Sequence, residues 1–268
     1  MIALITGASS GIGEATARRL AREPGTRLVL VARREERLQA LARELGGDPL
    51  VVAVDLTDDD APARILAALT ERHDRLDLLV NNAGAGWRGA FGDVGADNLR
   101  RHVDLNLHAP ARLTEALLPL LRASAPSSIV NVASTAGRIS RAGSGAYSAS
   151  KFALIGWTDA LHMEERPNGV HVGLVNPGFV PTEGFPQQEL IAKAATRWMV
   201  STPEKVAEAI LDAGPGGAAE RYAPRPYRLA GIARLLLPGL TRRVLGGGGA
   251  KTFATSTGAD AADRRPEG

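Results

Sequence analysis

Residues 2–13 read IALITGASSGIG, an aliphatic run followed by a turn rich in glycine and serine. The run predicts a buried strand, and glycines 7, 11 and 13 predict a tight turn that leads directly into a helix. In such a strand–turn–helix unit, backbone N–H groups and the helix dipole can hold the pyrophosphate of a dinucleotide. The spacing is not GxGxxG, so a tight turn that binds no ligand remains an alternative. The position between a first strand and a first helix favours a dinucleotide site.

Further apolar runs with almost no polar alternation follow this unit, at 27–32, 50–54, 76–80, 128–133 and 170–175. Runs of this kind are typical of strands that are covered by helices on both faces. Helical patterns lie between them, at 13–23, 33–45 and 58–73. The alternation predicts an α/β fold, a doubly wound parallel sheet in a three-layer sandwich, with ligands beyond the carboxyl ends of the strands.

Composition narrows the class of protein. The chain has 268 residues, of which 44% are hydrophobic and 23% charged, and its formal net charge is +3. This is ordinary for a globular domain, and the scattered arginines argue against a nucleic-acid partner. The absence of cysteine excludes disulfides and cysteine-based metal sites, and no histidines have HxxxH spacing, so we expect no metal. No secretory signal is visible, and we expect a cytoplasmic protein.

The end of the second predicted strand bears on the choice of dinucleotide. A site for NAD usually has an acidic residue there, for the ribose 2′-hydroxyl, whereas arginine suits the 2′-phosphate of NADP. Here the sequence is VARREER, and Arg33 stands in the place of the acid. We therefore predict NADP(H) rather than NAD(H), with Arg33 on the ligand and Arg34 in solvent.

Several motifs together resemble the short-chain dehydrogenase/reductase family. They are TGASSGIG at 6–13, NNAG at 81–84, Ser134, YSASK at 147–151 and NPGFVPT at 176–182. The resemblance covers roughly residues 1–213, with the motifs in consistent order against the strands. It implies cofactor contacts at these residues: Gly7, Ser9, Gly11, Ile12, Gly13, Arg33, Asp55, Leu56, Asn82, Ala83, Gly84, Tyr147, Lys151, Pro177, Gly178, Val180 and Thr182.

Tyr147 and Lys151 stand four residues apart, so a helix places them on one face, with only small residues between them. A phenol is a poor acid–base catalyst near neutral pH unless its anion is stabilised. A nearby ammonium favours the phenolate, and we expect Lys151 to lower the pKa of Tyr147. The resemblance implies that Tyr147 exchanges the proton and that Lys151 also contacts the nicotinamide ribose.

Ser134 and Asn106 complete the expected catalytic set. A hydroxyl at Ser134, just past a strand, can donate to a substrate oxygen as charge builds on it. Asn106 matches the family residue whose backbone takes part in a proton relay to the lysine. The chain departs from the family pattern nearby, because Ala109 and Pro110 stand where a glycine is common. Proline tends to kink a helix, so we expect a distorted helix around Asn106.

We expect one domain over residues 1–225, with a substrate lid at 183–202. Residues 226–245 form a basic amphipathic segment, and residues 246–268 are expected to be disordered. Three roles of the amphipathic segment stay open: packing on its own domain, covering the cleft of a partner subunit, and peripheral membrane contact.

The predicted function is interconversion of a carbonyl and a secondary alcohol with NADP(H), in a homodimer or homotetramer as the resemblance implies. The substrate class stays open among acyl thioester ketones, steroid-like ketones, sugars and xenobiotics. The alternative is a catalytically silent NADP(H)-binding sensor.

Overall fold

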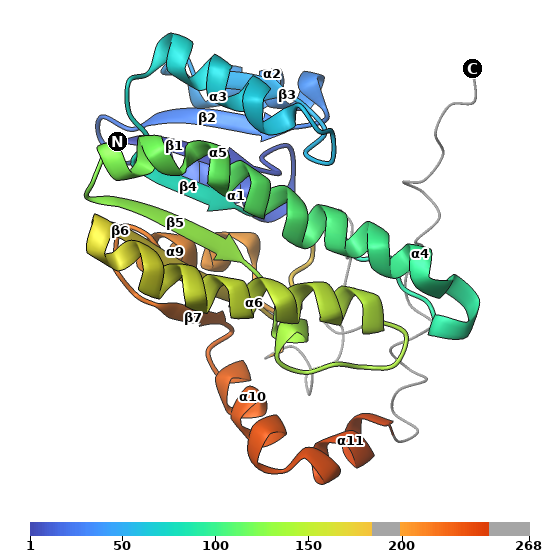
Figure 1. Ribbon diagram of the computed structural model, residues 1–268. Helices are drawn as coiled ribbons and strands as arrows, with labels where there is room; N and C mark the ends of the chain where they lie inside the picture. Colours follow the sequence, from blue (N-terminus) through green and yellow to red (C-terminus); the bar gives the residue numbers. More distant parts are fainter. Residues whose placement is uncertain (184–198, 247–268) are drawn as a thin grey trace, which may run out of the picture.

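The computed structural model describes residues 1–183 and 199–246, and a parallel sheet runs through the middle of this part (Figure 1). Its strand order is β3-β2-β1-β4-β5-β6-β7, and every neighbouring pair is parallel. The strands are β1 (Ile2–Thr6), β2 (Arg27–Ala32), β3 (Leu50–Ala53), β4 (Leu78–Asn81), β5 (Ser127–Val132), β6 (Val170–Pro177) and β7 (Glu220–Ala223). The order reverses between β1 and β4, which makes that point the expected ligand crevice.

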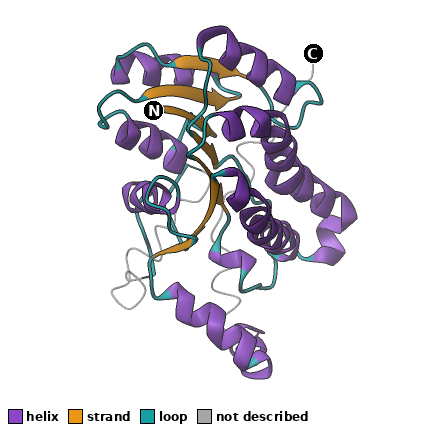
Figure 2. Cartoon of the chain, turned by 60° about the vertical axis from the view of Figure 1, so that its left-hand side comes forward, coloured by secondary structure: helices purple, strands orange, loops and turns teal. Residues whose placement is uncertain are grey.

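Helices cover both faces of the sheet (Figure 2). Those in the strand crossovers and after β6 are α1 (Gly11–Leu20), α2 (Glu35–Leu45), α3 (Ala61–Arg72), α4 (Phe91–Val103), α5 (Ala109–Ala123), α6 (Gly145–Glu165) and α9 (Pro203–Ala213). A π-helical turn, Asp104–His108, joins α4 to α5, and two more helices follow β7: α10 (Tyr227–Leu236) and α11 (Pro238–Gly246).

The two faces have separate hydrophobic cores. One contains Ile65 of α3, Leu117 of α5 and Leu161 of α6, and the other contains Leu20 of α1, Leu38 of α2 and Ile210 of α9. Each fully buried aliphatic side chain of this kind stabilises the fold by about 1.5–3 kcal/mol. Because the strands are covered on both sides, their sequences are apolar without alternation, as the sequence predicted.

The doubly wound three-layer fold is confirmed, and the six predicted strands lie within about two residues of their expected positions. The seventh strand, β7, was not predicted. Its sequence, ERYA, is short and polar, and it pairs only at the sheet edge, where a continuous apolar run is not required. Residues 203–213 form a capped helix, in which the Thr202 hydroxyl accepts a hydrogen bond from the Lys205 amide at 3.3 Å.

Most of the predicted lid at 183–202 and nearly all of the predicted tail at 246–268 lie outside the described residues.

Within residues 1–183 and 199–246, no helix combines the length and hydropathy that spanning a bilayer requires.

Gly173 fixes the packing of α9 on β6. A Cβ atom there would lie 1.9 Å from the carbonyl oxygen of Ala213, which is backbone and cannot turn aside. Gly156, in the exposed middle of α6, has no such neighbour within 4 Å.

We predict that Gly173→Ala lowers the free energy of unfolding by about 1–3 kcal/mol through overpacking. The matched change Gly156→Ala should raise it by about 0.5–1 kcal/mol, because alanine is the better helix residue. Urea unfolding curves measure both. Equal stability of Gly173→Ala and the unchanged protein would contradict the packing argument.

Candidate functional site

The sequence-predicted residues gather at one edge of the sheet, where the strands end. The segments that reach this edge are Gly7–Gly13 after β1, Arg33 after β2, Asp55 and Leu56 after β3, Asn82–Gly84 after β4, Ser134 after β5, and Pro177, Gly178, Val180 and Thr182 at and after the end of β6. Tyr147 and Lys151 come from α6, and Asn106 from the π-helical turn. The fold therefore brings the whole predicted set to the expected ligand crevice.

The glycine turn has the shape of a phosphate cradle. A Cβ at Gly13 would lie 2.2 Å from the Gly7 carbonyl oxygen, and Gly7 itself adopts a positive φ of 67°. Gly13 therefore has no room for a side chain, and the positive φ of Gly7 favours glycine there. Ser10 occupies the N-cap of α1, but its side chain makes no capping hydrogen bond to the first-turn amides. Unsatisfied amides at a helix N-terminus fit a pyrophosphate, so the residues present fit a bound dinucleotide.

Hydrogen bonds join this turn to the end of β4. The Thr6 hydroxyl accepts from the amides of Asn82 and Ala83, at 3.0 Å each, and donates to the Val80 carbonyl at 3.2 Å. The Asn82 side chain donates to the Thr6 carbonyl at 2.9 Å. Asn82 thus has the local structural role that a loop asparagine often has, in addition to any contact with a ligand.

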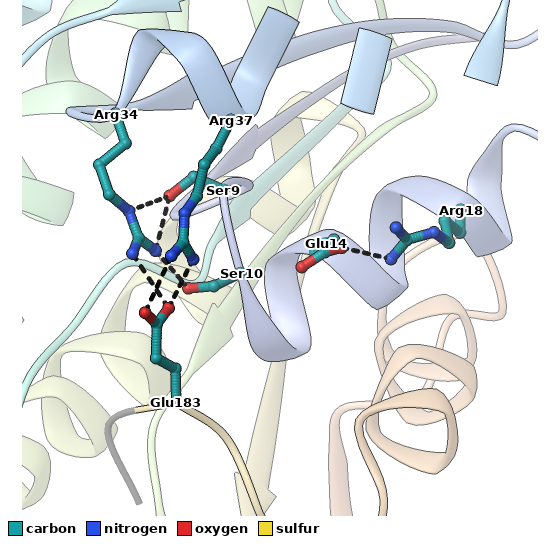
Figure 3. Close-up of polar contacts among 7 residues, drawn as sticks. All are labelled: Ser9, Ser10, Glu14, Arg18, Arg34, Arg37 and Glu183. Atoms are coloured by element: carbon teal, nitrogen blue, oxygen red, sulfur yellow. Dashed lines mark hydrogen bonds and ion pairs between the residues drawn. The ribbon is translucent and has the colours of Figure 1, made fainter. Parts of the chain in front are cut away.

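A cluster of charges lies beside the glycine turn, as Figure 3 shows. Arg34 donates to the Ser10 hydroxyl at 2.9 Å and to the Ser9 hydroxyl at 3.3 Å, and it pairs with Glu183 at 3.0 Å. Arg37 pairs with the same carboxylate at 2.7 Å. The prediction that Arg34 points only into solvent is wrong, because the turn from β2 into α2 aims it at the serines.

Arg33 is more exposed to solvent than Arg34. Its side chain is 76% exposed, and its nearest charged partner is Asp55, at 3.5 Å. Asp55 also accepts hydrogen bonds from the amide and hydroxyl of Thr57, at 3.0 and 2.8 Å. Burial acts to raise the pKa of Asp55, but these hydrogen bonds and the Arg33 charge outweigh it and lower the pKa.

The environment of Tyr147 differs from the expectation. Burial raises the pKa of this phenol, while a hydrogen bond with Ser134 and the charges of Arg88 and Arg141 act in the opposite direction. Burial outweighs them, and the Lys151 charge is not among the groups that oppose it. The expected lowering of the Tyr147 pKa by Lys151 is therefore not observed.

Lys151 is buried beneath the site, with 3% of its surface exposed. Its ammonium group donates to the Val132 carbonyl at 3.0 Å, at the end of β5. Burial disfavours the charged form and lowers the pKa of Lys151 to about 8. A Cβ at Gly84 would lie 3.3 Å from Nζ, so the glycine of NNAG keeps the space beside the lysine open.

Asn106 lies in the predicted distorted helix, which is the π-helical turn immediately before Pro110. Its side chain is fully buried and bridges two segments. It donates to the Ala85 carbonyl and to the Ser150 hydroxyl, both at 3.0 Å, and accepts from the Ala85 amide at 3.1 Å. Asn106 thereby fixes the loop after β4 against α6, directly beside Lys151. π-Turns of this kind are frequent at functional sites.

Sequence reasoning missed Arg88 and Arg141, whose charges act on Tyr147. They lie in the loops after β4 and after Ser134, which are joined by a hydrogen bond from the Gly89 amide to the Gly143 carbonyl at 3.0 Å. Arg141 also packs over the Phe179 ring, 4.8 Å from its centroid. Loop arginines carry no periodic signal, so only a fold that joins the loops reveals them.

His102 packs inside the domain. It is fully buried, accepts from the Trp87 amide at 2.9 Å and contacts the Asn98 carbonyl at 2.7 Å. Among the described residues, no group of three or more His, Asp or Glu side chains is arranged to hold a metal ion.

The family model described as short chain dehydrogenase matches residues 1–190. Dehydrogenase/reductase SDR family member 7B of Danio rerio is 35% identical over 190 residues, which are 68% of this chain and 61% of that protein, so this chain spans less than two thirds of it. The monensin polyketide synthase putative ketoacyl reductase of Streptomyces virginiae is 39% identical over 186 residues, 68% of this chain and 71% of that protein. The crystal structure of a short-chain dehydrogenase from Streptomyces avermitilis matches with a TM-score of 0.75 and 33% identity, over 91% of this chain and 95% of that one.

The low pKa of Lys151 gives a direct prediction. The side chain should be an ammonium below pH 8 and a neutral amine above it, because burial penalises the charge. An NMR titration of 13C-labelled lysine side chains measures this, and Lys151→Arg identifies the signal by its loss. A Lys151 midpoint at the ordinary value of 10.5 would contradict the buried placement.

Proposed function

The chain belongs to the short-chain dehydrogenase/reductase family and is an oxidoreductase, and on this premise we propose that it interconverts a carbonyl and a secondary alcohol with NADP(H). One observation carries the proposal: Ser134, Tyr147, Lys151 and Asn106 meet at the edge of the sheet that also carries the glycine cradle. When bound, the reduced nicotinamide supplies the hydride to the carbonyl carbon.

Tyr147 is the proton donor in the reducing direction. Burial raises its pKa, so the phenol is protonated near neutral pH and has a proton to donate as an alkoxide forms. The Ser134 hydroxyl, hydrogen-bonded with Tyr147, is placed to donate to the same oxygen. In the oxidising direction the phenolate is the base, so oxidation should be favoured by higher pH.

Lys151 and Asn106 assist Tyr147 without donating the proton to the substrate themselves. The Lys151 ammonium, charged below about pH 8, is the buried cation of the site and holds the ribose of the dinucleotide. Asn106 keeps the loop after β4 and α6 at a fixed separation through its bonds to Ala85 and Ser150. We assign Asn106 a positioning role toward the relay that restores the proton.

The charge cluster at the glycine turn supports a preference for NADP(H). Arg34 reaches Ser9 and Ser10, and together with Arg37 it already holds an anionic group, the Glu183 carboxylate. A 2′-phosphate carries more charge than a carboxylate and can take bidentate contacts from guanidinium groups. We propose that Arg33 and Arg34 share this phosphate and that Glu183 competes with it for Arg34.

The family acts on small carbonyl or alcohol substrates and often forms oligomers. Among the substrate classes considered, we propose a ketone of an acyl chain, because relatives of this chain carry the description ketoacyl reductase. Phe179 and Tyr227, with ring centroids 6.5 Å apart, supply an apolar wall beyond the loop after β6. We propose a homodimer or homotetramer as the assembly.

The first test of this function is Tyr147→Phe. We predict that kcat for NADPH oxidation with a panel of ketones falls about a hundredfold or more, since the proton donor is lost. The dissociation constant for NADPH, measured by fluorescence, should stay nearly unchanged, because the ring remains in place. Tyr222→Phe, outside the catalytic set, serves as the matched control. A Tyr147→Phe variant with most of the original rate would refute the assignment, and an inactive unchanged protein would support the sensor alternative.

The second test concerns the dinucleotide. We predict that Arg34→Gln and Arg33→Gln each weaken NADPH binding about 10–100-fold, the range that corresponds to one charge-assisted hydrogen bond, and leave NADH binding unchanged. Glu183→Gln should tighten NADPH binding, because it removes the competing anion. Arg43→Gln, an exposed arginine on α2, the helix that follows Arg33 and Arg34, is the control. Equal dissociation constants of the unchanged protein for NADH and NADPH would contradict the preference.

A further inference from the structure

The apolar face of the last two described helices is not covered by the rest of the described chain. Seven of the eleven exposed large hydrophobic side chains in residues 1–183 and 199–246 lie between 229 and 244, which marks this segment as the main apolar surface. They are Leu229, Ile232, Leu235, Leu236, Leu237, Leu240 and Val244, exposed by 42–77%. We call these seven residues the C-terminal apolar patch.

The spacing of the patch follows the helices. In α10, Leu229, Ile232 and Leu236 recur at intervals of three and four residues, and Leu237, Leu240 and Val244 continue the pattern along α11. The opposite side of α10 is the one that packs on the domain, since Gly231 is buried against Arg138. Packing on its own domain, one of the three roles considered for this segment, therefore does not cover the leucines.

Figures 1 and 2 both show α10 and α11 projecting from the β7 edge of the sheet, clear of the helices that cover its faces. The projection is anchored at its base. The Tyr227 ring lies against Gly178, where a Cβ would be 2.4 Å from Cε2, and its hydroxyl donates to the Met199 carbonyl at 3.2 Å. The base of α10 is thus in contact with Gly178, in the loop after β6.

The charge of this segment selects the kind of partner. Residues 221–246 contain no Asp or Glu, whereas α10 and α11 contribute Arg228, Arg234, Arg242 and Arg243. A second copy seated on the same patch would bring these arginines toward their own counterparts, which is unfavourable in a twofold interface. An anionic bilayer surface matches both properties, because leucines enter the acyl boundary while arginines extend to the headgroups.

We propose that the protein docks on anionic membranes through the C-terminal apolar patch, with α10 and α11 lying in the plane of the interface. The proposal is independent of catalysis and stands whether or not the dinucleotide preference is correct.

The test is co-sedimentation of the full chain with vesicles of phosphatidylcholine alone or with 30 mol% phosphatidylglycerol added (about one lipid in three, enough to give a clearly negative surface). We expect binding to the anionic vesicles that is at least about tenfold stronger than to the neutral ones and weaker at high salt. The double change Leu235→Glu with Leu240→Glu, and separately Arg242→Glu with Arg243→Glu, should each weaken the anionic partition about tenfold or more. Met163→Glu, which changes an equally exposed side chain on α6, should leave it unchanged.

Each alternative outcome overturns the proposal. The full chain could fail to bind anionic vesicles, or both double variants could bind as the unchanged protein does, which would place binding elsewhere. Light scattering could show that the leucine variant loses an oligomer, which would assign the patch to a second copy. NADPH oxidation with a water-soluble ketone, equal in all variants, shows that they are folded and separates this result from a failure of the proposed catalytic function.

Discussion

The close contact between the ends of β1 and β4 is the constraint on which the rest of the site depends. Gly13 lies against the Gly7 carbonyl, and Asn82 lies against both glycines, at separations that leave no room for a Cβ atom. The Thr6 hydroxyl connects the two strand ends by accepting from two consecutive amides. This contact brings the start of α1 to the point where the strand order reverses, so that a phosphate cradle and the loop leading to Asn106 border the same crevice.

Burial sets the electrostatics of the crevice. It raises the pKa of Tyr147 and lowers that of Lys151, so both groups are shifted toward their neutral forms. The charges that act on the phenol come from Arg88 and Arg141, on two loops joined by the Gly89–Gly143 hydrogen bond. The lysine is instead held at the end of β5 through Val132. Tyr147 and Lys151 thus occupy one helix face but have separate polar surroundings.

The sequence was sufficient for the fold because each central strand is an apolar run that must be covered on both faces, and because the glycine turn has a fixed place between β1 and α1. Strand β7 was not predicted, since this short polar edge strand has neither an apolar run nor an alternation of apolar and polar residues. The expected catalytic residues were predicted from the spacing of Tyr147 and Lys151 and from the resemblance to the family. The directions of individual side chains could not be predicted from the sequence. Arg34 rather than Arg33 contacts the serines. Arg88 and Arg141 both act on Tyr147 because loops far apart in sequence lie in contact.

Two buried polar residues of the site, Lys151 and Asn106, lower the stability of the folded chain, and this favours catalysis over dinucleotide binding alone. A lysine that is 3% exposed, with a pKa near 8, destabilises the folded chain relative to an apolar residue of similar size. Asn106 is buried completely in a π-helical turn that replaces ordinary helix hydrogen bonds. A nucleotide sensor requires the glycine cradle, the arginines beside it and a cation for the ribose, but it has no use for a distorted helix that buries Asn106 beside the tyrosine helix. Groups with pKa values shifted by burial are frequent at catalytic sites, and Lys151, with a pKa lowered to about 8, lies next to the cradle.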